Sequence, residues 1–276
     1  MIRLAVRVAR ADAELALAEL LVLAPAGVEE VDVADDVVEY AIYGAEGELP
    51  DLGEVRAAAG DALVEVSSSV VGDDWAQRWR EFHQPLQIPS HPPLRLRAPW
   101  HEPSAPGELE VVIDPGQAFG TGMHPTTRLC LELLLGLPRP VEGGRGPVSV
   151  ADLGCGSGVL SIAAAKLGFA PVDGYDHELE SVAATVENAA ANDVAVGAHP
   201  WDLRTDPVPH APLVLANLLR PLLLELAARQ DERPELLIAS GLLAHEADEV
   251  AAAFGGMLEA DRRELDGWAA LLLRAE

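Results

Sequence analysis

The chain has 276 residues, of which 49% are hydrophobic and only 4% aromatic, so its core must be built mainly from Ala, Leu and Val. Its 45 acidic and 19 basic residues leave a formal net charge of −26. Non-specific binding to nucleic acid needs clustered Lys and Arg, so this charge argues against it and favours a basic protein partner. Acidity that only maintains solubility explains the charge equally well.

The two cysteines, Cys130 and Cys155, form neither a metal-ligand pattern nor a disulfide framework, which is typical of buried thiols in a reducing compartment. The N-terminal residues alternate like a strand and lack the apolar core of a signal peptide. No apolar run reaches the roughly 18 residues that a membrane helix requires. We therefore expect a soluble, cytoplasmic protein with no membrane segment and no metal site.

Residues 1–68 predict a small α+β domain of the ferredoxin-like type, because their elements follow the order β-α-β-β-α-β. The expected elements are a strand over 2–8, a helix over 11–24, a hairpin of strands 28–33 and 37–43, a helix over 52–59 and a strand over 62–68. Residues 69–106 are interpreted as a linker with a tryptophan-containing helix over 73–82 and a Pro-rich stretch that includes an edge strand over 94–98.

From residue 107 to residue 276 strands alternate with helices, which indicates a mostly parallel sheet covered on both faces. This is a Rossmann-like α/β domain. We expect strands over 109–113, 148–153, 171–175, 213–216, 236–239 and 268–273, and helices near 125–135, 159–167, 178–191, 221–229 and 244–254.

The strongest functional signal is a strand–loop–helix–strand unit. A hydrophobic strand carrying Asp152 runs into Gly154, Gly156 and Gly158, and the strand after the next helix ends on Asp176. Glycine permits a ligand to approach the backbone, and an acid at that strand end can accept hydrogen bonds from ribose hydroxyls. The third glycine comes one residue too early for the dinucleotide fingerprint G-x-G-x-x-G. A ribose-bearing cofactor without a pyrophosphate, most commonly S-adenosylmethionine, therefore fits better than NAD.

A second signal is the polar loop over 114–127, which reads Asp-Pro-Gly-Gln-Ala-Phe-Gly-Thr-Gly-Met-His-Pro-Thr-Thr. It leads into a helix that Thr126 or Thr127 should cap, with Pro125 at the threshold. The amides after the proline could meet the carboxylate of a methionine moiety. We give His124 no catalytic role, because a capping or packing histidine is at least as consistent with this position.

A third signal is Asn217, a poor strand residue at the end of the predicted strand over 213–216. Its amide both donates and accepts hydrogen bonds. At the carboxyl end of the fourth parallel strand it would lie beside the cofactor. For this residue taken alone, a turn former is the alternative.

Together these segments resemble the PrmA family, methyltransferases of large-subunit ribosomal protein eleven at the base of the stalk. The family loop D-P-G-x-A-F-G-T-G-x-H-x-T-T matches Asp114 to Thr127. The family motif D-x-G-x-G-S-G-x-L-x-I-A-A matches Asp152 to Ala164, and A-N-[IL]-L matches Ala216 to Leu219. Ser240 to Leu243 is similar to the family's S-G-I-L. The resemblance spans almost the whole chain.

This resemblance implies an S-adenosyl-L-methionine-dependent protein N-methyltransferase that modifies lysine or N-terminal amines of that basic ribosomal protein, free or on the ribosome. The N-terminal domain would recognise the substrate. The enzyme would be a monomer without sequence-specific binding to nucleic acid. The cofactor-binding residues implied by the resemblance are Phe119, Gly120, Thr121, Thr127, Asp152, Gly154, Gly156, Gly158, Asp176 and Asn217, with Thr121 and Asn217 also at the methyl-transfer site.

The chain departs from the family pattern at two places. His177-Glu178 replaces the family's I-D-P after the ribose acid, which concerns the adenine side of the site. Arg220 follows the A-N-L-L element, and this cation near the target opening would oppose a lysine substrate unless it points away.

Several alternatives are weighed against this function. They are a methyltransferase of another protein or of a small-molecule amine, a glutamine or base methyltransferase, a NAD-dependent oxidoreductase and a catalytically inactive binding module. Glutamine and base methyltransferases often carry a Pro-Pro-Tyr turn where this chain has Leu218-Leu219-Arg220. For the transfer itself we hypothesise in-line attack by a neutral amine, whose pKa of about 10.4 falls through desolvation beside the sulfonium.

Overall fold

The computed structural model describes residues 2–13, 16–17, 20, 23–24, 28–34, 36–44, 49–70, 84–114, 124–140, 149–230 and 232–276. The chain separates into two compact units, Met1–Phe82 and His83–Glu276. The boundary between them falls inside the segment predicted as a linker. The predicted helix over 73–82 lies outside the described residues.

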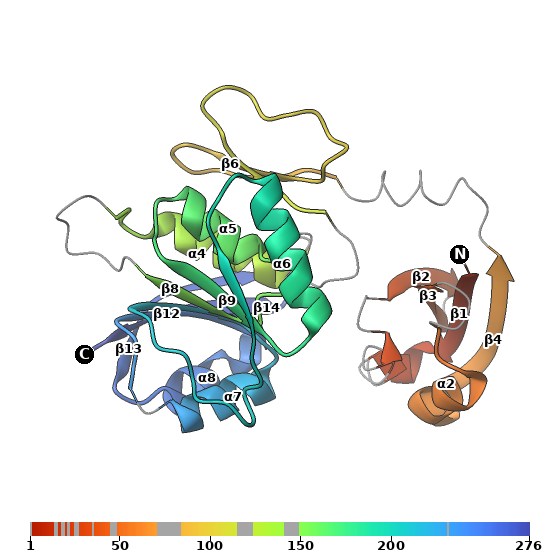
Figure 1. Ribbon diagram of the computed structural model, residues 1–276. Helices are drawn as coiled ribbons and strands as arrows, with labels where there is room; N and C mark the ends of the chain where they lie inside the picture. Colours follow the sequence, from red (N-terminus) through yellow and green to blue (C-terminus); the bar gives the residue numbers. More distant parts are fainter. Residues whose placement is uncertain are drawn as a thin grey trace. The chain divides into compact units, whose positions relative to one another are not determined.

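The first unit contains an antiparallel sheet in the order β2-β3-β1-β4 (Figure 1), which is the ferredoxin-like arrangement expected from the sequence. Apolar side chains from alternate strand positions pack with α2 and with buried residues between 13 and 24, the described part of the first predicted helix. Asp51 and Glu54 form a reciprocal capping box at the start of α2. The elements are β1 (Ile2–Ala9), η1 (Arg10–Asp12), β2 (Glu29–Ala34), β3 (Val37–Gly44), α2 (Leu52–Ala59), η2 (Gly60–Ala62) and β4 (Leu63–Val70).

The other face of this sheet carries a chain of ion pairs. Glu39 on β3 is 5% exposed. It accepts hydrogen bonds from Arg3 Nη2 at 2.5 Å and from Arg7 Nε at 2.7 Å. Arg7 Nη1 also donates to Glu65 Oε2 at 2.6 Å. Burial alone would raise the pKa of Glu39, but the two arginines outweigh it and hold the pKa below its ordinary value.

The second unit is built on a seven-stranded sheet in the order β10-β9-β8-β11-β12-β14-β13. The first five strands are parallel to one another, β14 is antiparallel to β12, and β13 is antiparallel to β14. This arrangement confirms the predicted Rossmann-like fold. Helices α4, α5 and α6 cover one face and α7 and α8 the other (Figure 1). The strands are β8 (Val150–Leu153), β9 (Val172–Asp176), β10 (Gly197–Pro200), β11 (Leu213–Asn217), β12 (Leu236–Leu243), β13 (Met257–Leu265) and β14 (Trp268–Ala275); the helices are α4 (Pro125–Gly136), α5 (Val159–Lys166), α6 (Leu179–Ala191), α7 (Arg220–Arg229), η3 (Ala244–Glu246) and α8 (Ala247–Ala253).

Four strands differ from the sequence expectation. One is β5 (Leu86–Ile88), which was not predicted because it lies in the Pro-rich stretch. β10 and β13 were not predicted, because both are edge strands: the first contains Gly and Pro, and the second is mostly polar. The strand expected over 109–113 forms, but as β7 (Leu109–Val112) of a separate three-stranded sheet with β5 (Leu86–Ile88) and β6 (Leu94–Arg97). This small sheet joins the core on the α4 and α5 side, so residues 86–112 belong to the second unit.

Both cysteines are buried and unpaired, as expected. Burial raises the pKa of each thiol far above its ordinary value. Within the described ranges no helix is both long and apolar enough to cross a bilayer.

Candidate functional site

The glycine loop lies where the strand order of the main sheet reverses. β8 is buried along its whole length and sits between β9 and β11, whose chain connections leave in opposite directions. In open α/β sheets this point, outside the carboxyl ends of the strands, forms the ligand crevice. Gly154, Gly156 and Gly158 follow β8, and all three have positive φ. The predicted glycine loop is therefore in the position that a ligand-binding loop requires.

Leu218 lies against both the glycine loop and the part of β12 around Gly241. A Cβ atom on Gly154 would lie 2.5 Å from Leu218 Cδ2, and one on Gly241 would lie 2.3 Å from the Leu218 carbonyl oxygen. Both glycines also have positive φ, which side chains rarely adopt. Leu218 N donates to Ser240 O at 3.0 Å. The Ser-Gly segment within β12, noted in the sequence only as similar to a family element, is thus part of the wall beside β11.

Asp176 ends β9 and faces the glycine loop. Its Oδ2 accepts a hydrogen bond from Gly156 N at 2.9 Å, and its Oδ1 accepts one from Glu178 N at 3.1 Å. The side chain of His177 is 70% exposed, with Nδ1 3.4 Å from Asp176 Oδ1. No Arg or Lys among the described residues pairs with Asp176. The carboxylate is held by backbone N–H groups and keeps acceptor capacity for a ligand.

Asp152 lies beneath the loop and is 1% exposed. Its Oδ2 accepts from Ser161 N at 3.1 Å and from Ser161 Oγ at 2.6 Å, which ties β8 to the first turns of α5. Its Oδ1 is buried and has no partner among the described residues. Burial raises the pKa of Asp152 to about 6, despite the opposing hydrogen bonds from Ser161. Oδ2 is therefore engaged in hydrogen bonds within the protein, and Oδ1 can accept a hydrogen bond from a ligand.

Asn217 and Thr127 meet, although they are far apart in the sequence. Thr127 is fully buried in α4, and Asn217 Nδ2 lies 3.4 Å from its Oγ1 as the donor of a hydrogen bond. The Oδ1 of Asn217 is buried without a partner among the described residues. Asn217 pairs in register with Ser240 on β12, at the carboxyl end of β11. The position that the sequence assigned to this amide is confirmed.

The cap of α4 differs from the prediction. His124, not Thr126 or Thr127, is the N-cap residue, and its Nδ1 accepts from Thr126 N at 3.4 Å. The N–H of Thr127 donates to His124 O at 3.1 Å. Both amides are therefore engaged in the cap, and the prediction that Thr126 or Thr127 caps the helix was wrong. With Pro125 at the first helical position, the residue just before it must cap, and the imidazole nitrogen replaces the usual hydroxyl.

His124 also packs against the ring of Trp268, edge to face, with centroids 4.7 Å apart. Burial lowers the pKa of His124, which favours the neutral ring that can accept at Nδ1. The capping and packing interpretation of this histidine is confirmed.

Two polar residues of α6 support the loop and were missed by the sequence interpretation. Thr185 Oγ1 donates to Gly156 O at 3.0 Å, and Asn188 Nδ2 donates to Ser157 O at 2.9 Å. Both side chains are buried. The signal was present, because polar residues three apart in an alanine-rich helix occupy one face. Nothing in the sequence alone showed that this face is the inner one.

Phe119, Gly120 and Thr121 lie outside the described residues. Arg220 is described, and its charge is offset by two acids. Its Nε lies 3.0 Å from Glu246 Oε1, and its Nη1 lies 2.7 Å from Glu249 Oε2.

Comparison with known proteins agrees with this geometry. The family model described as Ribosomal protein L11 methyltransferase (PrmA) matches residues 6–276. Proteins named Ribosomal protein L11 methyltransferase from Geotalea uraniireducens and Azotobacter vinelandii are 37% and 38% identical, over 76% and 79% of this chain and 70% and 74% of their own. The chain belongs to the ribosomal protein L11 methyltransferase family. It is therefore an S-adenosyl-L-methionine-dependent protein methyltransferase, and the rival enzyme classes and the inactive binding module are not favoured.

A solved member of the family has the same fold. The crystal structure of ribosomal protein L11 methylase from Lactobacillus delbrueckii subsp. bulgaricus matches with a TM-score of 0.56 and 29% identity, over 66% of this chain and 95% of that one.

The residues of this L11 methyltransferase family member fit the cofactor chemically. Asp152 Oδ1 and Asn217 Oδ1 are buried acceptors without partners among the described residues, and Asp176 is an acceptor that no described Arg or Lys pairs with. S-adenosyl-L-methionine presents an ammonium group and ribose hydroxyls, which are donors, and a positive sulfonium. The site thus offers acceptors and negative charge where the cofactor offers donors and positive charge.

Proposed function

We propose that this protein transfers methyl groups from S-adenosyl-L-methionine to lysine or N-terminal amines of ribosomal protein L11. The observation that carries the proposal is the set of buried acceptors around the glycine loop, with Asn217 Oδ1 at the carboxyl end of β11 and without a partner in the described part of the chain. Unpartnered buried acceptors are costly, so their retention favours a ligand that supplies donors.

Each residue has a proposed role. Asp176 holds the ribose hydroxyls, the loop from Gly154 to Gly158 passes beneath the methionine part, and Asp152 supports that loop and offers Oδ1 to a donor. Thr127 fixes the amide of Asn217 through the contact between Oγ1 and Nδ2. Phe119, Gly120 and Thr121 are proposed as cofactor contacts on the sequence motif alone, with Thr121 also at the transfer site.

The cofactor supplies an electrophilic methyl group on a positively charged sulfur. Asn217 Oδ1 would accept a hydrogen bond from the substrate nitrogen and so direct its lone pair toward the methyl group. Removal of the amine from water beside positive charge lowers the amine's pKa, so a neutral nucleophile forms without a dedicated base. His124 is not needed as that base, because its Nδ1 is engaged in the cap of α4.

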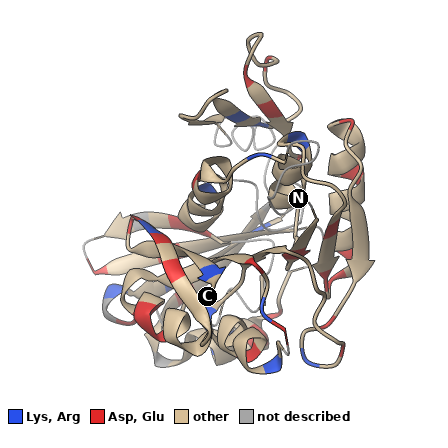
Figure 2. Ribbon diagram, turned by 90° about the vertical axis from the view of Figure 1, so that its left-hand side faces the viewer, with Lys and Arg blue, Asp and Glu red and all other residues tan. Residues whose placement is uncertain are grey.

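The charge of the chain suits a basic substrate. Acidic side chains far outnumber basic ones, and Lys and Arg are scattered among them on the described ribbon (Figure 2). Long-range attraction would speed the encounter with a basic ribosomal protein. Arg220, paired with Glu246 and Glu249, does not present a bare cation to a lysine. We further propose that the first unit recognises the substrate and that the enzyme acts as a cytoplasmic monomer without sequence-specific contacts to nucleic acid.

The test is transfer of labelled methyl groups to purified L11 and to ribosomes that lack the modification, followed by mass spectrometry of the product. We expect label on L11, and loss of about a hundredfold in kcat at saturating cofactor for Asn217→Ala. Gln230→Ala is a matched control, because Gln230 also has a buried amide oxygen without a partner among the residues described, but caps the C-terminal end of α7. Cofactor binding without any transfer to L11 would reject the proposal.

A further inference from the structure

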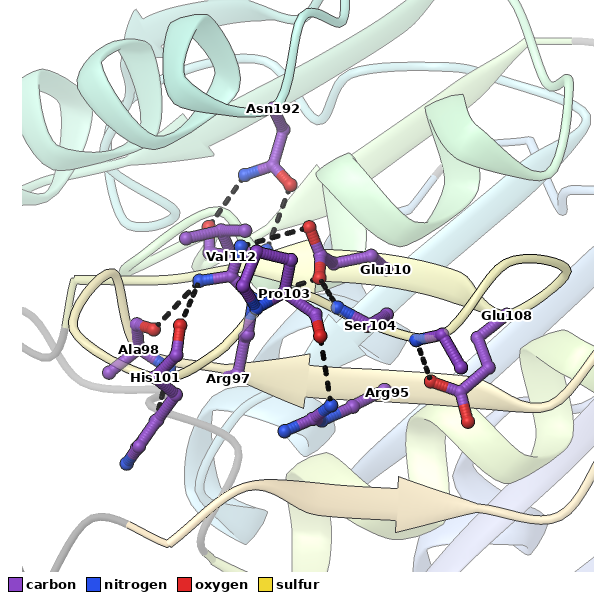
Figure 3. Close-up of polar contacts among 11 residues, drawn as sticks. Arg95, Arg97, Ala98, His101, Pro103, Ser104, Glu108, Glu110, Val112 and Asn192 are labelled. Atoms are coloured by element: carbon purple, nitrogen blue, oxygen red, sulfur yellow. Dashed lines mark hydrogen bonds and ion pairs between the residues drawn. The ribbon is translucent and has the colours of Figure 1, made fainter.

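Asn188 of α6 and Asn192, the C-cap residue of that helix, are each 5% exposed and hold other parts of the second unit. Asn192 bonds to β7 and, through Nδ2, to the backbone oxygen of Asn188 at 2.8 Å. Its Oδ1 accepts from Val112 N at 2.8 Å and its Nδ2 donates to Val112 O at 2.6 Å (Figure 3). It thereby satisfies the free edge of β7, as a neighbouring strand would.

Asn188 lies one helical turn earlier and joins two separate segments. Its Oδ1 accepts from Asp114 N at 3.0 Å, and its Nδ2 donates to Ser157 O at 2.9 Å. A backbone N–H can only donate and a backbone carbonyl can only accept, so the orientation of the amide is fixed by its partners. One side chain therefore connects the first residue of the 114–127 motif with the centre of the glycine loop.

We propose that Asn188 is a positioning residue that holds the two cofactor segments in mutual register. The inference rests on the proposed function, in which the residues after Asp114 and the residues around Ser157 bind the same cofactor molecule. The bond to Ser157 is buried and the bond to Asp114 is partly buried, and no other side chain among the described residues bonds to both segments. The asparagine amide carries its donor and its acceptor on separate atoms, as this bridge requires.

Register matters for affinity because the cofactor must contact both segments at once. When the bridge is lost, a smaller fraction of molecules holds both segments in the binding arrangement, and the apparent Kd rises in proportion. Once the cofactor is bound, its own contacts restore the arrangement. The effect should therefore appear in the cofactor Kd and KM more than in kcat.

The first test compares Asn188→Ala with Asn192→Ala in the full chain, by calorimetry with S-adenosyl-L-methionine and by thermal melting. Asn188→Ala loses two side-chain hydrogen bonds and Asn192→Ala loses three, so we expect the fall in Tm to be at least as large for Asn192→Ala. Asn188→Ala should raise the cofactor Kd about tenfold with kcat at saturating cofactor within about twofold, and Asn192→Ala should change the Kd less than about twofold. Equal shifts in Kd for both variants, or none for Asn188→Ala, would overturn the proposal.

The second test is Asn188→Asp, which keeps the acceptor for Asp114 N. Ionised, it turns an acceptor oxygen toward the Ser157 carbonyl; protonated, it can donate there. The ratio of its cofactor Kd to that of the wild type should therefore fall toward one as pH is lowered from 8 to 5.5. Asp114, Asp152 and Asp176 are present in both proteins, so the ratio compares chains that differ only in the side chain at position 188. A ratio independent of pH would contradict the bridge.

Failure of these tests is distinct from failure of the proposed function. If Asp176→Ala abolishes cofactor binding while both Asn188 variants bind like the wild type, the proposed cofactor site is supported and the positioning role of Asn188 is rejected. If Asp176→Ala also binds normally, the proposed site itself is wrong.

Discussion

Buried carboxylates have different partners in the two units. On the sheet of the first unit, Glu39 is held by Arg3 and Arg7, and its pKa is lowered. In the second unit, Asp152 and Asp176 have no Arg or Lys partner among the described residues and are held by N–H groups and by the hydroxyl of Ser161. Burial raises the pKa of Asp152 to about 6.

The difference separates structural acids from ligand-binding acids. A carboxylate paired with arginines has its charge balanced by the fold itself. A buried carboxylate without a cation is costly to the folded protein, and such groups concentrate at functional sites. A ligand that brings positive charge and donors would offset that cost. The contrast therefore supports the glycine-loop region as the place where the cationic cofactor binds.

The largest expected effect is the loss of cofactor affinity when Asp176 is replaced. Replacing it with Ala should weaken S-adenosyl-L-methionine binding by about a thousandfold, near 4 kcal/mol, because hydrogen bonds to a charged acceptor contribute about 1.5–3 kcal/mol each and ribose has two hydroxyls. The fold should persist, because the acid has no Arg or Lys partner among the described residues to leave unpaired. Calorimetry measures the Kd, and circular dichroism checks the fold. Unchanged affinity would remove Asp176 from the site.

Asp176, the glycines and Asn217 were predictable from the sequence because each breaks a local rule. Glycines with positive φ must follow β8, and an amide must end β11, so unusual residue types mark these positions. Edge strands β10 and β13 lack such a signal, since exposure to solvent at the sheet edge allows polar residues where a central strand would be hydrophobic. The roles of Asn188 and of His124 depend on tertiary neighbours. Polar residues in an alanine-rich helix and a histidine before proline have many other uses.

The second expected effect is a change in the pH dependence of stability on replacing Asp152 with Asn. The folded pKa near 6 lies above the ordinary value of 3.8, so the native state binds more protons between these pH values. Wild-type stability therefore loses up to about 3 kcal/mol from this group as pH rises from 4 to 7. The variant lacks this loss. Its free energy of unfolding relative to wild type should rise by that amount over the same window, measured by urea denaturation.

Asp152→Asn thus tests whether a buried acid without a cationic partner destabilises the ligand-free protein. The amide oxygen can still accept from Ser161, so the tie between β8 and α5 survives. A difference in stability that stays constant from pH 4 to pH 7 would show that the carboxyl is not destabilised by burial. The contrast with Glu39 would then disappear.

The smallest expected effect is the loss of stability when Glu39 is replaced. Glu39→Gln removes the charge that Arg3 and Arg7 share and should lower the free energy of unfolding of the first unit by about 2 kcal/mol. Because the folded pKa of Glu39 is lowered, this stabilisation is present above its unfolded pKa and is lost as pH falls through the folded value. The deficit of the variant should therefore shrink in acid, opposite to the behaviour of Asp152→Asn. The cofactor Kd should be unchanged, since Glu39 belongs to the other unit.

Glu65→Gln is the matched control for this last change. Glu65 also bonds to Arg7, but its side chain is 53% exposed, and exposed pairs contribute about 0–1 kcal/mol. If Glu65→Gln destabilises the first unit as much as Glu39→Gln, burial is not what makes the arginine-held acid important. If Glu39→Gln instead weakens cofactor binding, the two units are coupled, and acids cannot be sorted into structural and ligand-binding groups by their partners alone.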